Sequence, residues 1–209
     1  AYAPAYRLVK AAYAPLLPLL PEIDVRLAQG KRTVLAIDGP CGSGKTTLAA
    51  LLARLYDCPV FHADDFFLRP EQRTPARFAE PGGNLDRERL LEEVLAPLRQ
   101  GQLVSFRRFD CHSLTLLPPV AVAPSSLAVV EGSYSLHPEL APMYDISVCL
   151  TLSPELQRRR ILARNGETMA RRFFERWIPL EQAYFDAMKP QTRCGFLIEA
   201  DQLSDEAPL

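Results

Sequence analysis

Lysine is scarce in this sequence, and a surplus of positive charge is absent. Of 24 basic residues, four are lysines, at positions 10, 31, 45 and 189, and the formal net charge is −1. A chain without a basic surplus is not expected to hold a nucleic acid by bulk electrostatic attraction. No apolar run approaches the roughly 18 residues that a membrane-spanning helix needs, so no contact with a membrane is predicted.

Closely spaced cysteine pairs are also missing. The five cysteines are widely separated and form no C-x-x-C motif. This pattern is typical of reduced thiols in a cytoplasmic protein, and it favours neither a disulfide framework nor a zinc site. The sequence contains no internal repeat, and 209 residues are enough for one well-buried core and short for two.

Residues 39–46 read GPCGSGKT, which fits the pattern G-x-x-x-x-G-K-[ST]. An apolar run at 33–37 precedes this loop, and a helix-forming run at 47–55 follows it. In that setting backbone N–H groups and a helix N-terminus point at a phosphate, whereas a glycine-rich turn that binds nothing is the alternative. Lys45 would reach the outer phosphates, and the Thr46 hydroxyl would ligate Mg²⁺. The predicted nucleotide-binding residues are Gly39, Pro40, Cys41, Gly42, Ser43, Gly44, Lys45, Thr46 and Thr47.

Apolar strands alternate with helical stretches along the rest of the chain. Strands are expected near 33–37, 59–63, 103–106, 127–130, 146–152 and 195–198, and a helix is expected over 86–100. The fold class predicted is α/β, a P-loop NTPase fold with a mainly parallel five-stranded sheet, helices on both faces and a helical lid. Residues 1–30 are expected to form a helical extension packed on a kinase domain at 31–209, with the lid at roughly 158–176.

Carboxylates follow two of the predicted strands. Asp64 and Asp65 come after the strand at 59–63, and Glu131 follows the strand at 127–130. The carboxyl edge of a parallel sheet is where ligands bind. Phosphoryl transfer needs a metal and a carboxylate that orients or deprotonates the attacking hydroxyl, and these acids would supply both. The alternative is that they cap turns.

The succession of motifs resembles the uridine kinases. After the phosphate loop come His-Ala-Asp-Asp-Phe-Phe at 62–67, Asn-Leu-Asp at 84–86, Phe-Asp-Cys-His-Ser at 109–113 and Val-Glu-Gly at 130–132. The sequence is similar also to the nicotinamide riboside kinases, which carry a close match to the Asp-Asp-Phe-Phe stretch. The resemblance covers roughly residues 32–198 and implies the nucleoside-kinase branch of the P-loop α/β proteins.

The resemblance also implies roles for individual residues. Asp64 would be the base that takes the proton of a substrate 5′-hydroxyl, and Glu131 would help to hold Mg²⁺ through water. Asp86 would grip the ribose hydroxyls, and His112 would lie near the nucleobase. Phe67 is a further expected substrate contact. It stands, like Asp65, where uridine kinases have a different residue.

Seven arginines flank the predicted helix break at 165–166. They are Arg158, Arg159, Arg160, Arg164, Arg171, Arg172 and Arg176. Guanidinium groups suit phosphate contacts, and a hinged helical flap can exclude water, so Arg160 and Arg164 are expected at the transferred phosphoryl group and Arg172 at the substrate. The alternative is a solvated helical face. Trp177 and Tyr184 are expected in the core.

Taken together, the sequence predicts an enzyme that uses ATP and Mg²⁺ to phosphorylate a hydroxyl group of a small molecule. The favoured acceptor is the 5′-hydroxyl of a nucleoside such as uridine or cytidine, and nicotinamide riboside or a pantothenate-like compound is the alternative. An alternative of another class is a P-loop ATPase that acts as a switch or chaperone on a protein partner. The expected location is the cytoplasm, and a homo-oligomer is left open.

Overall fold

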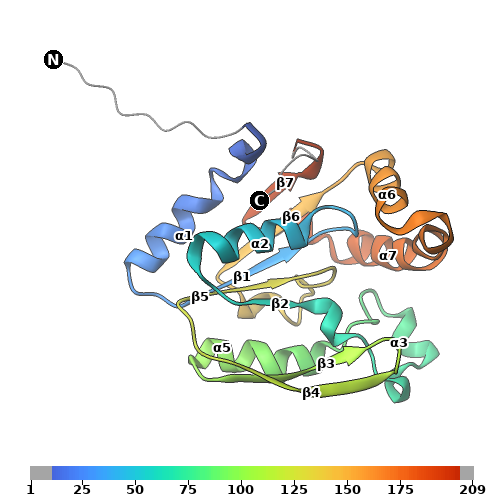
Figure 1. Cartoon of the computed structure of the whole chain (residues 1–209), viewed down its shortest axis with the longest axis horizontal. Coiled ribbons are helices and arrows are strands. Elements are labelled where there is room, and N and C mark those ends of the chain that lie inside the picture. Colours follow the sequence, from blue (N-terminus) through green and yellow to red (C-terminus); the bar gives the residue numbers. More distant parts are fainter. Residues whose placement is uncertain (1–10, 203–209) are drawn as a thin grey trace.

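The computed structural model describes residues 11–202, so residues 1–10 of the predicted N-terminal extension lie outside the described residues. A five-stranded sheet lies at the centre, in the order β2-β5-β1-β6-β7, with every pair parallel (Figure 1). Its strands are β1 (Thr33–Asp38), β2 (Val60–His62), β5 (Leu127–Glu131), β6 (Ile146–Thr151) and β7 (Phe196–Glu199). The predicted α/β fold with a five-stranded parallel sheet is confirmed.

Helices cover both faces of this sheet. Their bounds are α1 (Leu19–Ala28), α2 (Lys45–Tyr56), α3 (Pro75–Ala79), α4 (Arg87–Leu90), α5 (Ala96–Gln100), α6 (Pro154–Arg172) and α7 (Ile178–Met188). The π-helical segments are η4 (Leu91–Leu95) and η6 (Phe173–Trp177). The 3-10 segments are η1 (Ala11–Leu16), η2 (Ala63–Phe66), η3 (Pro70–Gln72), η5 (Ala141–Met143), η7 (Pro190–Thr192) and η8 (Ala200–Gln202).

Two hydrophobic clusters pack on opposite faces of the sheet. Leu35 and Ile37 of β1 lie in one cluster, where Leu19 and Ile23 of α1 pack together with α2. Val34 lies in the other cluster, with the helical run from α4 to α5 and with strand β3. Successive side chains of a strand point to opposite faces, so the alternation along β1 divides the core into two layers.

An antiparallel ribbon stands beside the main sheet. It pairs β3 (Val104–Asp110) with β4 (Thr115–Val122), and β4 was not predicted. Pro118 and Pro119 in β4 obscure the strand pattern, because proline cannot donate a ladder hydrogen bond and is confined to edges, strand starts and bulges. The ladder accommodates Pro119 opposite Arg107, where the register shifts.

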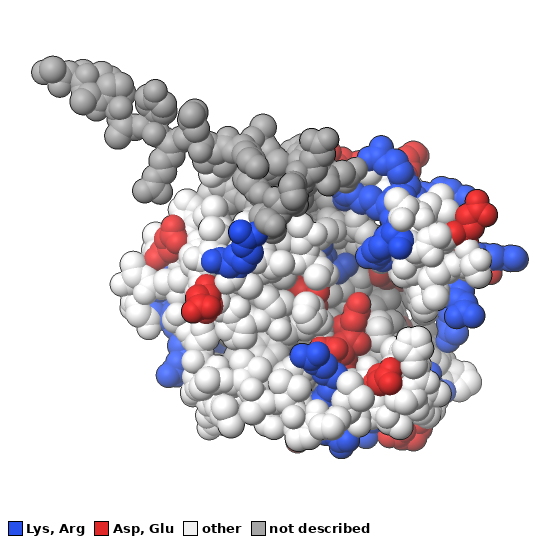
Figure 2. Space-filling view, viewed as in Figure 1, with Lys and Arg blue, Asp and Glu red and all other residues white. Residues whose placement is uncertain are grey.

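The residues of the predicted lid, roughly 158–176, fall within α6 and η6. The backbone leaves the helical conformation at Gly166 (φ 67°, ψ 169°), which confirms the predicted break. This run lies at the right of the view in Figure 1, and Figure 2 shows Lys and Arg side chains gathered there. Within residues 11–202, no helix has the length and apolar character needed to cross a membrane.

Candidate active site

The phosphate loop joins β1 to α2, as predicted. At its first residue, Gly39, an added Cβ would lie 2.7 Å from the carbonyl oxygen of Leu150, so only glycine fits there without a shift. Lys45 is buried, and its Nζ donates to the carbonyl oxygens of Gly39 at 2.8 Å and Pro40 at 3.1 Å. It also donates to the hydroxyl of Ser133 at 3.3 Å. These three partners of the ammonium group, the ones found within residues 11–202, are all neutral.

A fully buried carboxylate, Asp38, anchors the start of the loop. It accepts backbone N–H groups from Gly39, Tyr134 and Leu136 at 2.7, 3.1 and 2.9 Å, and the hydroxyl of Tyr184 at 2.7 Å. Burial raises the pKa of Asp38, and these hydrogen bonds oppose the shift. The sequence reasoning missed Asp38, although an acid at the end of an otherwise apolar strand directly before the loop is a visible signal.

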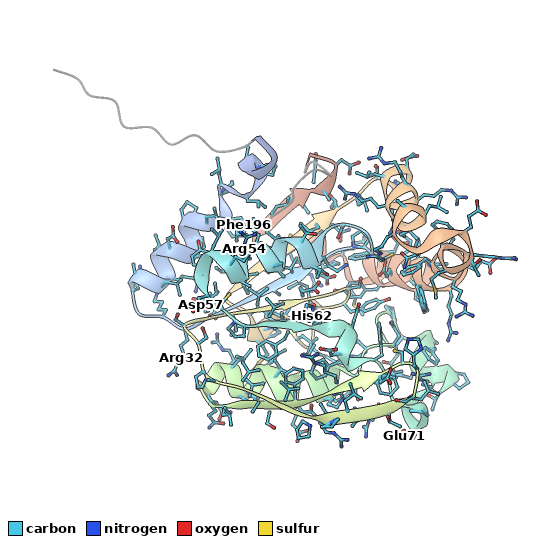
Figure 3. All side chains as sticks on the ribbon, in the orientation of Figure 1. Arg32, Arg54, Asp57, His62, Glu71 and Phe196 are labelled. Atoms are coloured by element: carbon cyan, nitrogen blue, oxygen red, sulfur yellow. The ribbon has the colours of Figure 1, made fainter. Side chains whose placement is uncertain are left out.

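Thr46 and Glu131 meet where α2 begins beside the end of β5. The Thr46 hydroxyl donates to Glu131 Oε1 at 3.1 Å, and the same oxygen lies 2.6 Å from Nδ1 of His62. Pairing of β2 with β5 places His62 opposite Glu131. The hydrogen bond to Glu131 is the main reason that the pKa of His62 is raised. Figure 3 shows His62 at the end of β2, near the centre of the molecule.

Asp64 lies in η2, directly after β2, at the same carboxyl edge of the sheet as Glu131. Asp64 is accessible from the cavity, yet the surrounding protein raises its pKa by desolvation, and the nearby carboxylates of Glu131 and Glu181 add to the shift. The end of β5 approaches this turn closely, because an added Cβ at Gly132 would lie 2.5 Å from the Cβ of Ala63.

The neighbouring Asp65 faces away from this site. Its carboxylate lies 3.6 Å from Arg108, and its carbonyl oxygen accepts Nη2 of Arg89 at 3.0 Å. Asp65 does not line the cavity described next.

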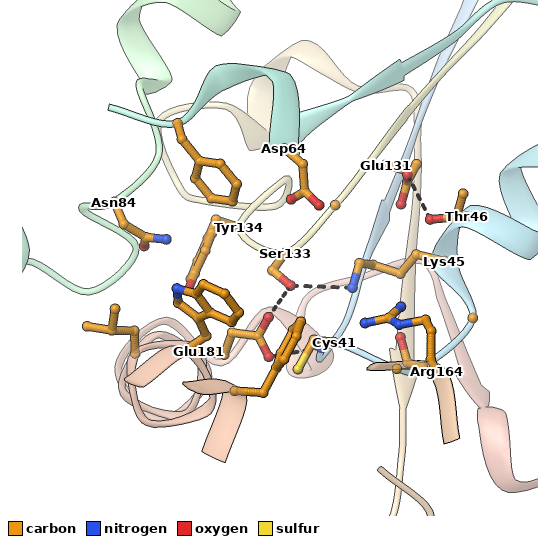
Figure 4. A pocket seen from close by; sticks show the side chains of 18 of the residues that line it. Cys41, Lys45, Thr46, Asp64, Asn84, Glu131, Ser133, Tyr134, Arg164 and Glu181 are labelled. Carbon is orange, nitrogen blue, oxygen red and sulfur yellow. Dashed lines mark hydrogen bonds between the residues drawn. The ribbon is translucent and has the colours of Figure 1, made fainter. Parts of the chain in front are cut away.

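A cavity of about 780 Å³ joins these elements (Figure 4). Phosphate-loop residues, Glu131 and Asp64 line it together with many apolar and aromatic side chains. The apolar and aromatic lining includes Phe67, Leu68, Phe78, Leu114, Phe173, Trp177 and Leu180. The exposure of Trp177, at 37%, makes its predicted core position wrong, whereas Tyr184 is fully buried as predicted. Trp177 is the last residue of η6, and its side chain lines the cavity.

The structure brings most of the predicted site residues to this cavity. Those that line it are Cys41, Gly42, Ser43, Gly44, Lys45, Thr46, Thr47, Asp64, Phe67, Glu131, Arg160 and Arg164. Those that do not are Gly39, Pro40, Asp86, His112 and Arg172. Gly39 and Pro40 instead contribute the carbonyl oxygens that hold Lys45.

Asp86 is buried and does not line the cavity. Its carboxylate accepts the backbone N–H of Arg89 at 3.2 Å, which caps α4, and it pairs with the Arg89 guanidinium at 3.3 Å. His112 is exposed in the turn between β3 and β4, and Arg172 is exposed at the end of α6. The roles assigned to these three residues stay predictions.

The arginines of the predicted lid make different contacts. Arg160 donates from Nη1 to the carbonyl oxygen of Gly42 at 3.3 Å, so it already contacts the phosphate loop. Arg164 hydrogen-bonds Asn165 and lies over the ring of Phe173. Arg176 also lines the cavity, although the sequence analysis gave this arginine no individual role.

Sequence reasoning missed two further polar residues, Ser133 and Glu181. The carboxylate of Glu181 accepts the N–H of Cys41 at 2.9 Å and the Ser133 hydroxyl at 2.7 Å. Ser133 could have been noticed because it follows Glu131 closely. Glu181 lies far along the chain, in α7, and no motif surrounds it in the sequence. Only the folded chain brings it to the phosphate loop.

The donor set fits Mg²⁺. A threonine hydroxyl and a carboxylate lie within 3.1 Å of each other at the phosphate loop, and oxygen ligands of this kind suit a hard cation that also binds phosphates. Among the residues that the structure describes, no group of three or more His, Cys, Asp or Glu side chains is arranged to hold a metal. A Mg²⁺ ion here would therefore depend on phosphate and water oxygens for most of its ligands.

The strand, loop and helix with this cavity define a nucleotide-binding protein of the P-loop class. Solved structures agree with this fold. A possible uridine kinase from Bacillus stearothermophilus aligns with a TM-score of 0.62 at 24% identity, covering 87% of this chain and 99% of that one. A candidate fructose transport system kinase from Silicibacter sp. TM1040 aligns with a TM-score of 0.66 at 22% identity, covering 86% and 95%.

Curated sequences refine the class. Dephospho-CoA kinase from Rhodopseudomonas palustris strain HaA2 is 32% identical over 146 residues, which is 65% of this chain and 72% of that enzyme. Uridine-cytidine kinase D from Dictyostelium discoideum is 28% identical over 122 residues, 56% of this chain and 23% of the relative. The mycobactin import protein IrtA of Mycolicibacterium smegmatis is 53% identical over 49 residues, only 6% of its length. No family model matches the chain.

These similarities identify the chain as a member of the P-loop kinases, with uridine kinase-like and dephospho-CoA kinase relatives. Kinases of this kind use ATP.

Proposed function

We propose that this protein is an ATP- and Mg²⁺-dependent kinase that phosphorylates a hydroxyl group of a small molecule, with the 5′-hydroxyl of a nucleoside such as uridine or cytidine as acceptor. The observation that carries the proposal is one cavity in which Lys45 and Thr46 of the phosphate loop face the same space as Asp64. The similarity to uridine-cytidine kinase D supports the acceptor class. The five cysteines are free thiols, which fits the cytoplasm as the location.

The phosphate end of the cavity would hold ATP. Lys45 is held by neutral oxygens, so its ammonium group is available to turn toward the outer phosphates as a point charge. Thr46 and Glu131 would hold Mg²⁺, which when bound neutralises phosphate charge. Arg160 and Arg164 line the same space from the lid, where their guanidinium groups would contact the phosphates and keep water out.

Asp64 would act at the acceptor end. Desolvation raises the pKa of Asp64 although the charge of Lys45 opposes the shift, and a carboxylate with a raised pKa is a stronger base toward a hydroxyl proton. Phe67 and Trp177 supply apolar surface for the body of the acceptor. The acceptor hydroxyl would therefore be oriented by Asp64 toward the phosphate that Lys45 holds.

A second acceptor, dephospho-CoA, is favoured by one specific observation. Dephospho-CoA kinases from two strains of Rhodopseudomonas palustris are 30% and 32% identical to this chain, and the match covers 72% of each enzyme. Under the proposed mechanism both acceptors would use the same phosphate loop and base, and they would differ in the groups that fill the apolar part of the cavity.

The test is an acceptor panel assayed for ADP release: uridine, cytidine, nicotinamide riboside, pantothenate and dephospho-CoA, with Lys45→Ala as the matched inactive control. Turnover that depends on uridine or cytidine and is absent in the control is expected. Selective turnover of dephospho-CoA would replace the nucleoside assignment. ADP release that no acceptor increases would refute acceptor phosphorylation and favour an ATPase switch.

A further inference from the structure

Glu181 on α7 is a buried carboxylate that the proposed reaction does not use. Its exposed fraction is 6%, and it points into the cavity between Ser133 and Cys41 (Figure 4). Its hydrogen-bond partners, the Cys41 N–H and the Ser133 hydroxyl, are both neutral. Burying a carboxylate against neutral partners is unfavourable, so a purely structural position would be served better by an uncharged side chain.

Ser133 connects this carboxylate to the loop lysine. Its hydroxyl has one proton and lies 2.7 Å from Glu181 Oε1, closer than the 3.1 Å to the Gly39 carbonyl oxygen. A hydroxyl donates preferentially to a charged acceptor, so the proton lies toward Glu181. The hydroxyl oxygen then accepts from Lys45 Nζ at 3.3 Å. A chain of hydrogen bonds thus runs from Lys45 through Ser133 and Glu181 back to Cys41.

The Cys41 N–H belongs to the loop whose backbone N–H groups face a phosphate. Glu181 Oε2 accepts a hydrogen bond from that N–H at 2.9 Å, as a phosphate oxygen would. The helix that carries Glu181, α7, follows directly on α6 and η6, which contain the predicted lid residues 158–176. An anion that reaches the Cys41 N–H must therefore compete with a group attached to the lid.

We propose that Glu181 is an internal anion that occupies the phosphate loop before nucleotide binds, and that the phosphates of the nucleotide displace it. Displacement would break the contacts of α7 with the phosphate loop. The binding of phosphate to the loop would then change the position of the predicted lid, which precedes α7. This inference rests on the proposed nucleotide binding but not on the identity of the acceptor.

The glutamine variant separates charge from shape. Glu181→Gln keeps the length of the side chain and an oxygen for the Cys41 N–H, but it removes the negative charge that competes with phosphate. Relief of like-charge repulsion at this range should strengthen the binding of ATP and of inorganic tripolyphosphate at least about tenfold. Tripolyphosphate carries neither base nor sugar, so it reports on the loop alone.

Trp177 provides the readout. It is the one tryptophan of the chain, lies one helical turn before Glu181, and lines the same cavity. Its emission should change when the carboxylate leaves the loop. We would titrate the full chain with tripolyphosphate and with ATP, and would check each dissociation constant by calorimetry. Glu175→Gln is the matched control, because Glu175 precedes Trp177 in η6 and its side chain is 61% exposed. It should change affinity less than twofold.

Unchanged or weaker binding of both ligands by a folded Glu181→Gln protein would overturn the inference. Glu181→Met, also unbranched and uncharged, is the second variant if the glutamine protein does not fold, and the same tightening is expected of it. If the wild-type chain bound neither ligand, the proposed nucleotide binding would fail as well. If it bound and turned over ATP while both Glu181 variants bound normally, only the role of Glu181 would be lost.

Discussion

Replacing Gly132 with alanine is expected to displace Asp64 and slow the reaction while the chain still folds. The new Cβ would lie 2.5 Å from the Cβ of Ala63 and 3.3 Å from the Ala63 nitrogen. Carbon atoms in contact are about 3.5–4 Å apart, so β5 and the turn that carries Asp64 must separate by about 1 Å. A misplacement of about 1 Å can cost roughly 10²-fold in rate, and a fall in kcat of about 100-fold is expected. Gly132 also has φ of 149°, where alanine is strained.

The assay is steady-state turnover with the best acceptor of the panel, beside a thermal melt. Overpacking should lower the free energy of unfolding by about 1–3 kcal/mol. Gly30→Ala is the control for positive φ, because Gly30 has φ of 68° and nothing within 4 Å. The double variant of Gly132→Ala with Ala63→Gly removes the clash between the two Cβ atoms and should recover most of kcat. A kcat of Gly132→Ala within about threefold of wild type would show that the close approach of Gly132 to Ala63 does not position Asp64.

The remaining predictions concern single side chains. Lys45→Ala should cut turnover by orders of magnitude in a folded protein, and full activity on any acceptor would contradict the kinase mechanism. Asp64→Asn should lower kcat with ATP and acceptor affinities nearly unchanged, as expected of a base, whereas Asp65→Asn should stay within a few-fold of wild type. An inactive Asp65→Asn beside an active Asp64→Asn would move the base by one residue. Glu131→Gln should raise the Mg²⁺ concentration needed for half-maximal rate. Burial, aided by a nearby arginine, lowers the pKa of His137 to about 4. Below about pH 6.5 the His137 side chain is protonated in the unfolded chain but stays neutral in the folded chain. The free energy of unfolding therefore falls as the pH is lowered from about 6.5 to about 4, by at most about 3 kcal/mol. Denaturant unfolding at both pH values measures the free energy of unfolding of the wild type and of His137→Asn. The wild type should lose more of it than the variant on acidification, and an equal loss in the two proteins would contradict this prediction.

The parallel sheet and the phosphate loop could be predicted because their signals are local. The motif at 39–46 and the apolar strands before and after it are contiguous in the sequence, and the rule that ligands meet the carboxyl edge of such a sheet brought Asp64 and Glu131 to the loop. Strand β4 was not predicted because its two prolines are unusual in a strand.

The residues that were missed depend on contacts between distant segments. Nothing near Glu181 or Tyr184 in the sequence indicates that α7 folds back onto the phosphate loop. Asp86 depends on the folded chain too. Its motif match predicts a ribose contact, which stays a prediction, whereas the cap of α4 and the pairing with Arg89 could be seen only in the structure.

The hydrogen bond from Tyr184 to Asp38 joins residues 146 positions apart and has a consequence for biosynthesis. During translation β1 and the phosphate loop emerge long before α7, and in that interval Asp38 lacks its hydroxyl partner and the Cys41 N–H lacks Glu181. A bond of such sequence separation forms late, because the intervening chain must first be made and ordered. The phosphate loop of the nascent chain therefore stays incomplete until α7 has emerged from the ribosome and folded back onto it.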